Sequence, residues 1–340
     1  MNVYDKRKRP LRDVRISVID SCNFRCGYCM PEESSGNAPK TTGKSRLSFP
    51  EISEIIDAFV YLGVEKIRLT GGEPLLRRNL PKLIEMIARR HGDLDIALTT
   101  NGSMLAKLAA ELRASGLKRL TVSLDTLDPE RFFILSGRRG RLEDVLLGIR
   151  MAEAAGFESI KINCVVQNGI NDADVLAIAD YFRWTRHIVR FIEFMDVGTC
   201  NRWDFGKVVS SRELLDRIAA RWPLVAMGKQ YPGEVANRYR YEDGAGEIGF
   251  ISSVSQPFCG DCNRARVSAS GDLYTCLFGH SGTSLRSFLS NDKARLITKI
   301  AETWSARDDR YSELRGIAGV AEVGAGRVEK KRIEMYMIGG

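Results

Sequence analysis

Short runs of apolar and β-branched residues recur along the first two-thirds of the chain and alternate with longer segments of helical spacing. The short runs, each predicted to be a strand, are Val14–Asp20, Ile67–Thr70, Ile96–Asn101, Leu120–Asp125, Ile160–Val166 and Val189–Met195. The helical segments between them are Phe49–Leu62, Leu80–Arg90, Leu105–Ser115, Leu142–Ala155 and Ala173–Trp184. This alternation predicts parallel βα units, arranged either as an open doubly wound sheet or as a barrel.

Local signals mark where several of these helices begin and end. Ser48 is followed three residues later by Glu51, the pattern of a capping box at a helix start. Gly63, Gly116 and Gly156 stand where helices are expected to end, and glycine is the residue that most readily takes a positive φ there. The helix boundaries are therefore predicted by two independent kinds of signal.

Unusual polar residues follow nearly every predicted strand. They include Gly71-Gly72-Glu73-Pro74, Thr99-Thr100-Asn101, Ser123-Leu124-Asp125, Lys161 with Asn163, and Glu193 to Met195. A βα barrel places its site at the carboxyl ends of all its strands, whereas an open sheet concentrates the site at one switch point. The polar strand ends therefore favour a barrel, full or partial.

The alternation of strand and helix stops after residue 196. A helix is predicted from Ser210 to about Trp222, and Arg238–Tyr241 and Glu247–Ile251 flank Asp243-Gly244-Ala245-Gly246 like the two strands of a hairpin. We therefore predict two domains, a barrel over residues 1–195 and a smaller α+β module over residues 196–340.

Composition and charge change this picture in two ways. The chain has 340 residues, 44% hydrophobic and 28% charged, which is typical of a globular protein. No run reaches the ~18 apolar residues of a membrane helix and no signal peptide is evident, so a cytoplasmic protein without a membrane partner is expected. The formal charge of +8 favours an anionic partner, although a solvated basic surface would explain it equally well.

Three of the eight cysteines form the segment Cys22-x3-Cys26-x2-Cys29 directly after the first predicted strand. Cysteine clusters in a cytosolic protein more often bind metal than form disulfides. Three thiolates are one fewer than a closed zinc site or a fully ligated four-iron cluster needs, so one iron of a cluster would stay open for a ligand. Structural zinc completed by a distant histidine is the alternative.

The segment from Cys22 to Cys29 resembles the signature of radical S-adenosylmethionine (radical SAM) enzymes, whose fold is a partial (β/α)6 TIM-like barrel. The resemblance implies a [4Fe-4S] cluster on Cys22, Cys26 and Cys29 that binds and reductively cleaves S-adenosylmethionine to a 5′-deoxyadenosyl radical. Tyr28 is similar to the residue near the adenine, and Gly71-Gly72-Glu73-Pro74 resembles the motif that receives the methionine amino group.

A second group of three cysteines, Cys259-x2-Cys262-x13-Cys276, lies in the C-terminal part of the chain. Arg264 and Arg266 follow the second of these cysteines and would suit an anionic substrate. From spacing alone, a zinc knuckle with His280 as fourth ligand remains an alternative to a second open cluster.

Both cysteine groups, the Arg264-x-Arg266 pair and the terminal Gly339-Gly340 together resemble the family of GTP 3′,8-cyclases, also called molybdenum cofactor biosynthesis protein A, over nearly the whole chain. The resemblance implies a lyase with a second [4Fe-4S] cluster, carried by the C-terminal module, that binds guanine. The radical would take hydrogen from C3′ of GTP, and C3′ would attack C8 to give 3′,8-cyclo-7,8-dihydro-GTP. A homodimer, a reductant such as flavodoxin or ferredoxin, and transfer of the product to cyclic pyranopterin monophosphate synthase are also expected.

The same resemblance assigns roles to individual residues. GTP would contact Arg15, Arg68, Thr99, Lys161, Arg264 and Arg266, while Gly72, Ser123 and Arg190 would help to hold S-adenosylmethionine or the triphosphate, and Met195 would pack near the adenine. Arg266, Gly339 and Gly340 would act in catalysis, the last two as a tail that enters the active site. Side-chain alternation allows Arg15, Arg68, Lys161 and Arg190 to line the lumen, whereas Met195 has the opposite parity to Arg190 and would need a bend before it.

Two other functions compete with this prediction. One is a radical SAM enzyme that modifies peptides, although such proteins usually carry a longer C-terminal cysteine array than the three cysteines here. The other is a zinc-dependent nucleic-acid-binding protein, which would account for the charge and the cysteine groups. It does not account for polar residues at every strand end, and no aromatic-rich basic motif accompanies it, so no nucleic-acid partner is expected.

Overall fold

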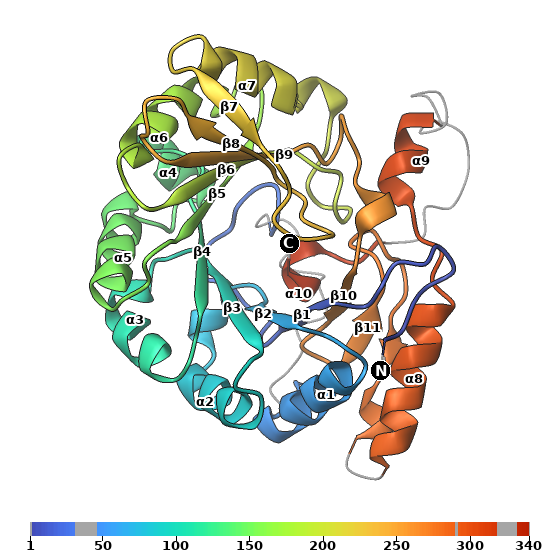
Figure 1. The fold of residues 1–340 in the computed structure, drawn as a ribbon. Coiled ribbons are helices and arrows are strands. Elements are labelled where there is room, and N and C mark those ends of the chain that lie inside the picture. Colours follow the sequence, from blue (N-terminus) through green and yellow to red (C-terminus); the bar gives the residue numbers. More distant parts are fainter. Residues whose placement is uncertain (1, 31–45, 290–291, 318–331, 340) are drawn as a thin grey trace.

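The structure, a computed structural model, describes residues 2–30, 46–289, 292–317 and 332–339. Its centre is a curved sheet of parallel strands around one axis (Figure 1). These strands are β1 (Asp13–Ser17), β2 (Lys66–Thr70), β3 (Asp95–Thr100), β4 (Arg119–Ser123), β5 (Lys161–Val166) and β6 (Ile188–Glu193). The predicted partial barrel of six parallel strands is therefore confirmed.

Helices connect these strands and cover the outer side of the sheet (Figure 1). They are α1 (Phe49–Tyr61), α2 (Leu80–Arg90), α3 (Leu105–Ala114), α4 (Pro129–Leu135), α5 (Leu142–Ala154) and α6 (Val175–Phe182). The capping box of Ser48 and Glu51 is present, and Gly63, Gly116 and Gly156 all take positive φ, as predicted. Helix α4, which the sequence pattern did not predict, begins at an Asp128 cap with proline in its first turn.

The strands that follow residue 196 continue the same sheet at both of its edges. They are β7 (Leu224–Met227), β8 (Asn237–Tyr241), β9 (Glu247–Ile251), β10 (Arg264–Val267), β11 (Asp272–Tyr274) and β12 (Thr283–Ser284). Strand β10 pairs in parallel with β1, and β9 pairs in parallel with β6. The antiparallel pairing of β8 with β9 confirms the predicted hairpin. The domain boundary at 195/196 stays a prediction, because one sheet runs through both parts.

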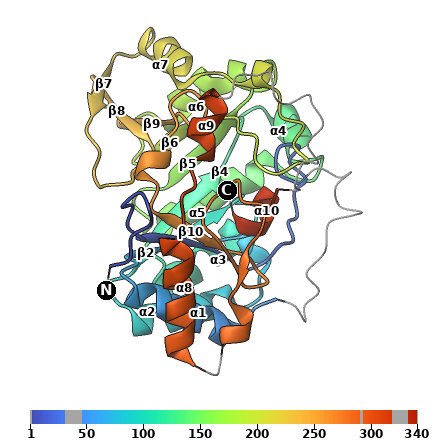
Figure 2. The same cartoon turned by 90° about the vertical axis from the view of Figure 1, so that its right-hand side faces the viewer.

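The remaining helices are α7 (Ser211–Ala219), α8 (Lys293–Ser305), α9 (Tyr311–Ile317) and α10 (Met335–Ile338). Figure 2 shows α8 lying alongside α1, and the fully buried Trp304 of α8 and Phe59 of α1 belong to one continuous core. Helix α10 lies against β1, inside the ring of strands in Figure 1. No helix in the described parts of the chain has the length and apolar character that crossing a bilayer demands.

Candidate functional site

The first cysteine group lies in the loop that leaves the carboxyl end of β1. Its three cysteines are half-buried free thiols. The backbone N–H groups of Cys29 and Met30 both donate to the Cys26 carbonyl, at 3.0 and 2.9 Å. Arg25 donates from Nη1 to the carbonyls of Cys22 and Phe24, at 2.6 and 2.7 Å. Other segments hold the loop as well: the Asn101 amide donates to Asn23 Oδ1 at 2.9 Å, and the Arg25 N–H donates to the Ser136 carbonyl at 2.8 Å.

The Gly71-Gly72 segment after β2 packs directly on this loop. The Gly72 N–H donates to the Ile19 carbonyl at 2.9 Å, and a Cβ on Gly72 would lie only 2.4 Å from the Ser21 oxygen and 3.0 Å from the Cys22 nitrogen. A side chain at position 72 would therefore push on the backbone that carries Cys22. Glu73 is fully buried and accepts hydrogen bonds from Asn101 N and Thr100 Oγ1, both at 2.7 Å, which holds the ends of β2 and β3 together.

Tyr28 and Ser123 line a small cavity together with Cys26, Asn101 and Asp125. The Tyr28 hydroxyl donates to Asp125 Oδ2 at 2.8 Å. Burial raises the pKa of Asp125 to about 6, although hydrogen bonds from Val165 N and Tyr28 oppose the rise. Burial also raises the pKa of the Cys26 thiol, and the neighbouring Asp125 carboxylate adds to that effect. The first cysteine group thus lies on the acidic side of the site.

Strand register places three arginines in one row. Arg15 of β1 is opposite Arg266 of β10 on one side and Arg68 of β2 on the other. Arg68 donates from Nη1 to Thr99 Oγ1 and Thr121 Oγ1, both at 3.0 Å. On β6, Arg190 donates from Nε to Asn163 Oδ1 at 2.9 Å.

These arginines line one cavity, hereafter the central cavity, together with the second cysteine group. Ten of the predicted site residues line it: Arg15, Arg68, Thr99, Arg190, Met195, Cys259, Cys262, Arg264, Arg266 and Cys276. Met195 follows the end of β6 at Glu193, so the alternation along that strand no longer restricts its direction. The structure therefore brings together side chains from β10 and from β6, two strands that are far apart in the order of the sheet.

Electrostatic repulsion is concentrated in the central cavity. Burial lowers the pKa of Arg190 to about 9, with Arg68 as the next cause, and lowers the pKa of Arg266 to about 10, with Arg264 as the next cause. The pKa of Arg15 also falls well below its ordinary value through burial and its arginine neighbours. The buried Nε atoms of Arg15, Arg264 and Arg266 have no hydrogen-bond partner among the residues that the structure describes. Unpaired buried cations are costly, so the cavity is built to receive an anion.

The second cysteine group forms one wall of the central cavity. Burial by itself would raise the pKa of Cys262, but Arg264 and Arg307 outweigh it and lower this pKa to about 6. The pKa of Cys276 rises to about 11, mainly because of burial. Cys262 is therefore ready to serve as a thiolate ligand at neutral pH.

Lys161 lies in an adjoining cavity that also contains Arg190. Burial lowers the pKa of Lys161 to about 7, with Arg190 as the next cause. Lys66, which the sequence analysis missed, lines another cavity with Arg15, Arg68 and Arg190, and burial lowers its pKa to about 6. Its position two residues before Arg68 on the same face of β2 was the available signal.

The chain's C-terminal tail reaches the carboxyl end of β2. Gly339 has φ 69°, and a Cβ there would lie 2.1 Å from Thr70 Oγ1. The buried Thr70 hydroxyl has no hydrogen-bond partner in the described part of the chain. Gly339 therefore lies at the end of β2, while Gly340 lies outside the described residues, and the catalytic role of this tail stays a prediction.

Two groups of free thiols, a glycine cradle and orphaned buried guanidinium nitrogens fit iron–sulfur clusters, S-adenosylmethionine and a polyanionic substrate. Among the described residues no three His, Cys, Asp or Glu side chains converge on a single ion position. A cluster takes each thiolate on a different iron, so its ligands need not converge in that way.

Two protein families match successive parts of this chain. The Radical SAM superfamily matches residues 16–182, and Molybdenum Cofactor Synthesis C matches residues 187–313. The first contains Cys22, Cys26 and Cys29, and the second contains Cys259, Cys262 and Cys276. Each cysteine group therefore falls within its own family match.

Full-length relatives are also similar. A "GTP 3′,8-cyclase" of Xanthomonas axonopodis pv. citri is 54% identical over 99% of this chain and 98% of its own length. One of Acidothermus cellulolyticus is 51% identical over 93% of this chain and 89% of its own. The crystal structure of Streptococcus suis SuiB bound to S-adenosylmethionine has a TM-score of 0.61 at 16% identity, covering 91% of this chain and 69% of that one, which is a likeness of fold.

Proposed function

The chain belongs to the family of GTP 3′,8-cyclases within the radical SAM superfamily, and we propose that it cyclises GTP between C3′ and C8, as a lyase, in molybdenum cofactor biosynthesis. The observation that carries this proposal is the central cavity, in which a row of arginines faces a second group of cysteines. A nucleoside triphosphate matches both features, because its phosphates would face the arginines and its purine would face the second cysteine group.

The arginines bind the triphosphate in this proposal. Arg15, Arg68 and Arg190 are held in place by strand register and by hydrogen bonds to Thr99, Thr121 and Asn163. Guanidinium groups donate to phosphate oxygens in pairs, so a preformed row costs little reorganisation. Lys161 and Lys66 add charge at the amino-terminal ends of the strands, next to the same arginines. Phosphate oxygens would offset the burial and the mutual repulsion that together lower the pKa values of these cations.

The second cysteine group and its two arginines bind the base and ribose. Cys259, Cys262 and Cys276 would hold a second [4Fe-4S] cluster with one iron open to the purine. Arg264 and Arg266 are buried on β10, beside that loop. Their side chains orient the ribose so that C3′ faces the first cysteine group, with Gly339 closing the site near Thr70. The role of Gly340 in catalysis is proposed from the family alone.

Cys22, Cys26 and Cys29 would hold the first [4Fe-4S] cluster, with S-adenosylmethionine bound by Gly72, Ser123, Tyr28, Met195 and Arg190. When bound, these groups supply the one-electron chemistry that removes a hydrogen atom from the substrate. The residues that bind S-adenosylmethionine exclude water and fix the distance between this cofactor and C3′ of the substrate. The acidic side of the site, near Asp125, suits the cationic S-adenosylmethionine.

Further parts of the proposal rest on the family alone. They are a homodimeric state, a cytoplasmic location, a flavodoxin or ferredoxin as reductant, and a cyclic pyranopterin monophosphate synthase that receives the product. Cross-linking of the reconstituted protein with each candidate reductant tests the electron donor. The two competing functions, peptide modification and zinc-dependent nucleic-acid binding, are not supported by the full-length relatives.

The decisive experiment is anaerobic incubation of the reconstituted chain with GTP, S-adenosylmethionine and dithionite. We expect 5′-deoxyadenosine together with a cyclised isomer of GTP, detected by mass spectrometry before and after dephosphorylation. Metal analysis should find about eight iron per chain, because each [4Fe-4S] cluster contributes four. Zinc without sulfide, or 5′-deoxyadenosine without any nucleotide product, would contradict the proposal.

A further inference from the structure

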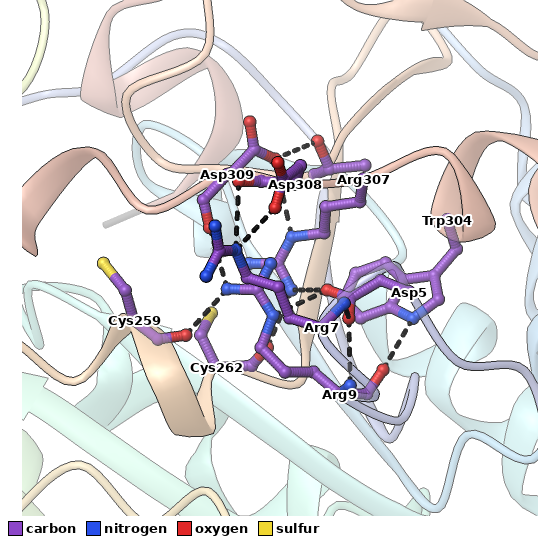
Figure 3. Close-up of polar contacts among 10 residues, drawn as sticks. Asp5, Arg7, Arg9, Cys259, Cys262, Trp304, Arg307, Asp308 and Asp309 are labelled. Carbon is purple, nitrogen blue, oxygen red and sulfur yellow. Dashed lines mark hydrogen bonds and ion pairs between the residues drawn. The ribbon is translucent and has the colours of Figure 1, made fainter.

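A buried ion network lies against the loop that carries Cys259 and Cys262 (Figure 3), and two of its members, Arg307 and Asp309, line the central cavity. It joins a turn near the N-terminus to the segment that follows α8. Asp5 Oδ2 accepts from Arg9 Nε at 2.6 Å and from Arg307 Nη1 at 3.4 Å. Asp5 Oδ1 accepts from the backbone nitrogens of Arg7 and Arg9, both at 2.9 Å. One carboxylate therefore fixes the turn and binds both arginines.

Each cysteine of the second group is reached by this network. Arg9 donates from Nη1 to the Cys259 carbonyl at 2.7 Å, and Arg307 donates from Nη1 to the Cys262 carbonyl at 2.7 Å. Asp309 accepts from the hydroxyl of Thr275, the neighbour of Cys276, at 2.5 Å and pairs with Arg307 Nε at 3.4 Å. Figure 3 shows both guanidinium groups lying against the loop from Cys259 to Cys262.

The network is almost completely desolvated. Arg9, Asp5 and Arg307 are 3%, 6% and 4% exposed, so their interactions are screened little by solvent. Arg307 also lines the central cavity beside the three cysteines, which brings its positive charge to the position of a bound cluster. The Trp304 indole donates to the Arg9 carbonyl at 3.1 Å, and its ring stacks on the Arg307 guanidinium. Movement of Arg9, Asp5 or Arg307 would therefore break a buried contact.

We propose that Arg9 and Arg307 are positioning residues that hold the loop of the second cysteine group and set the reduction potential of the cluster bound there. The inference rests on the proposed function, because it requires that a cluster binds these cysteines. Asp5 pairs with both guanidinium groups, but Arg307 also lines the cavity beside the cysteines, whereas Asp5 does not. The positive charge of Arg307 would stabilise the reduced, more negative state of a cluster there and so raise its potential. Carbonyls held by guanidinium groups also fix where the Cys259 and Cys262 thiolates point.

Charge and shape are separable at Arg307. Arg307→Lys keeps the positive charge but loses the planar fork, whereas Arg307→Gln keeps a donor and loses the charge. Arg7 provides a matched control, because it lies on the same turn and pairs with Asp308 at 2.5 Å but is exposed. Arg7→Gln therefore removes a charge from the solvent side of the same region.

The test uses the full chain with Cys22, Cys26 and Cys29 all changed to Ser, so that only the second cluster contributes to the spectra. Redox titration followed by electron paramagnetic resonance measures the midpoint potential, and release of iron to a chelator measures retention. We expect Arg307→Gln to shift the potential to more negative values and Arg307→Lys to leave it near the unaltered value. Both Arg307 variants and Arg9→Gln should release iron roughly 10- to 100-fold faster. Arg7→Gln should change neither quantity.

Equal potentials and equal iron release in Arg9→Gln, Arg307→Gln and the unaltered chain would overturn the inference alone. A chain with intact Cys22, Cys26 and Cys29 that binds about four iron rather than about eight would overturn the proposed second cluster, and this inference with it. If Arg307→Gln does not fold, iron release from Arg307→Lys and Arg9→Lys tests the positioning role instead, and both should lose iron faster than the unaltered chain. Retention at the unaltered rate in both variants would reject the positioning role.

Discussion

The two cysteine groups are held in different ways. The first is held by Arg25 of its own loop, which donates to the carbonyls of Cys22 and Phe24, and by the strand ends beside it, and its thiols lie near the buried Asp125. The second is held by residues from the two ends of the chain, Arg9 and Arg307. Burial raises the pKa of Cys26, whereas arginines lower that of Cys262 to about 6.

This contrast shows how two separate cavities on one sheet can serve two ligands of opposite charge. A carboxylate-rich surrounding favours a cation such as S-adenosylmethionine, and a cationic surrounding favours a triphosphate. The same geometry separates radical generation from substrate binding, because each group has its own supporting residues. Changes at one group should therefore leave the other intact, and the following predictions test that independence.

The largest effect is expected from Cys22→Ser. Loss of one of three ligands should abolish formation of 5′-deoxyadenosine, because the first cluster would no longer bind the cofactor productively. Iron at the second group should remain, at about four per chain. Chromatography of 5′-deoxyadenosine and metal analysis check both parts. Cys164→Ser is the control, since Cys164 is a fully buried core residue that belongs to neither cysteine group. Normal cofactor cleavage in Cys22→Ser would contradict the ligand assignment.

Arg266→Ala should have the next largest effect, and this effect concerns the second cysteine group. We expect cyclised product to fall on the order of 100-fold, because a buried charged donor to the substrate is lost. Formation of 5′-deoxyadenosine and the iron content should be maintained, so the two activities become uncoupled. Product and 5′-deoxyadenosine are quantified in the same reaction. Cyclisation at the normal rate would show that Arg266 has no role in substrate positioning.

Gly72→Ala should weaken the first group without changing any ligand. The new Cβ would lie 2.4 Å from the Ser21 oxygen and must displace the backbone that carries Cys22. We expect S-adenosylmethionine cleavage to fall roughly 10- to 100-fold, because a displacement of this size disrupts a reactive geometry. Gly92→Ala is the matched control, since a Cβ there meets nothing within 4 Å. GTP affinity, measured by calorimetry, should be the same in both variants.

The smallest effect concerns pH and the cationic part of the site. Burial lowers the pKa of Lys161 to about 7, so Lys161 loses its proton as the pH rises above 7 in the free protein. Phosphate favours the protonated form, so GTP binding at pH 8 should take up a proton, and affinity should fall by at most about tenfold per pH unit for each coupled proton. Calorimetry in buffers of different ionisation heat measures the uptake. Lys161→Met should reduce it, and an unchanged uptake would place the proton elsewhere.

The first cysteine group was almost fully predictable from the sequence. Cys22, Cys26 and Cys29 share one loop, the strand before them has a clear apolar run, and Ser48 with Glu51 marks the next helix start. The hydrogen bonds that Arg25 makes to Cys22 and Phe24 join near neighbours, so the local residue pattern carries them. The bond from Asn101 to Asn23 joins distant segments and could not be predicted in this way. Alternation also predicted that Arg15 and Arg68 face inward, but Lys66 was missed although it has the same parity.

The chain by itself determined the six βα units, the two cysteine groups and the residues with chemical capacity, because periodicity and spacing are local properties. Only the tertiary structure decided that Arg266 lies opposite Arg15, that β9 and β10 extend both edges of one sheet, and that Gly339 meets Thr70. It also decided that Arg9 and Arg307 converge on Asp5. Contacts between residues so far apart along the chain follow from how strands pair and helices pack, and those contacts leave no periodic trace in the sequence.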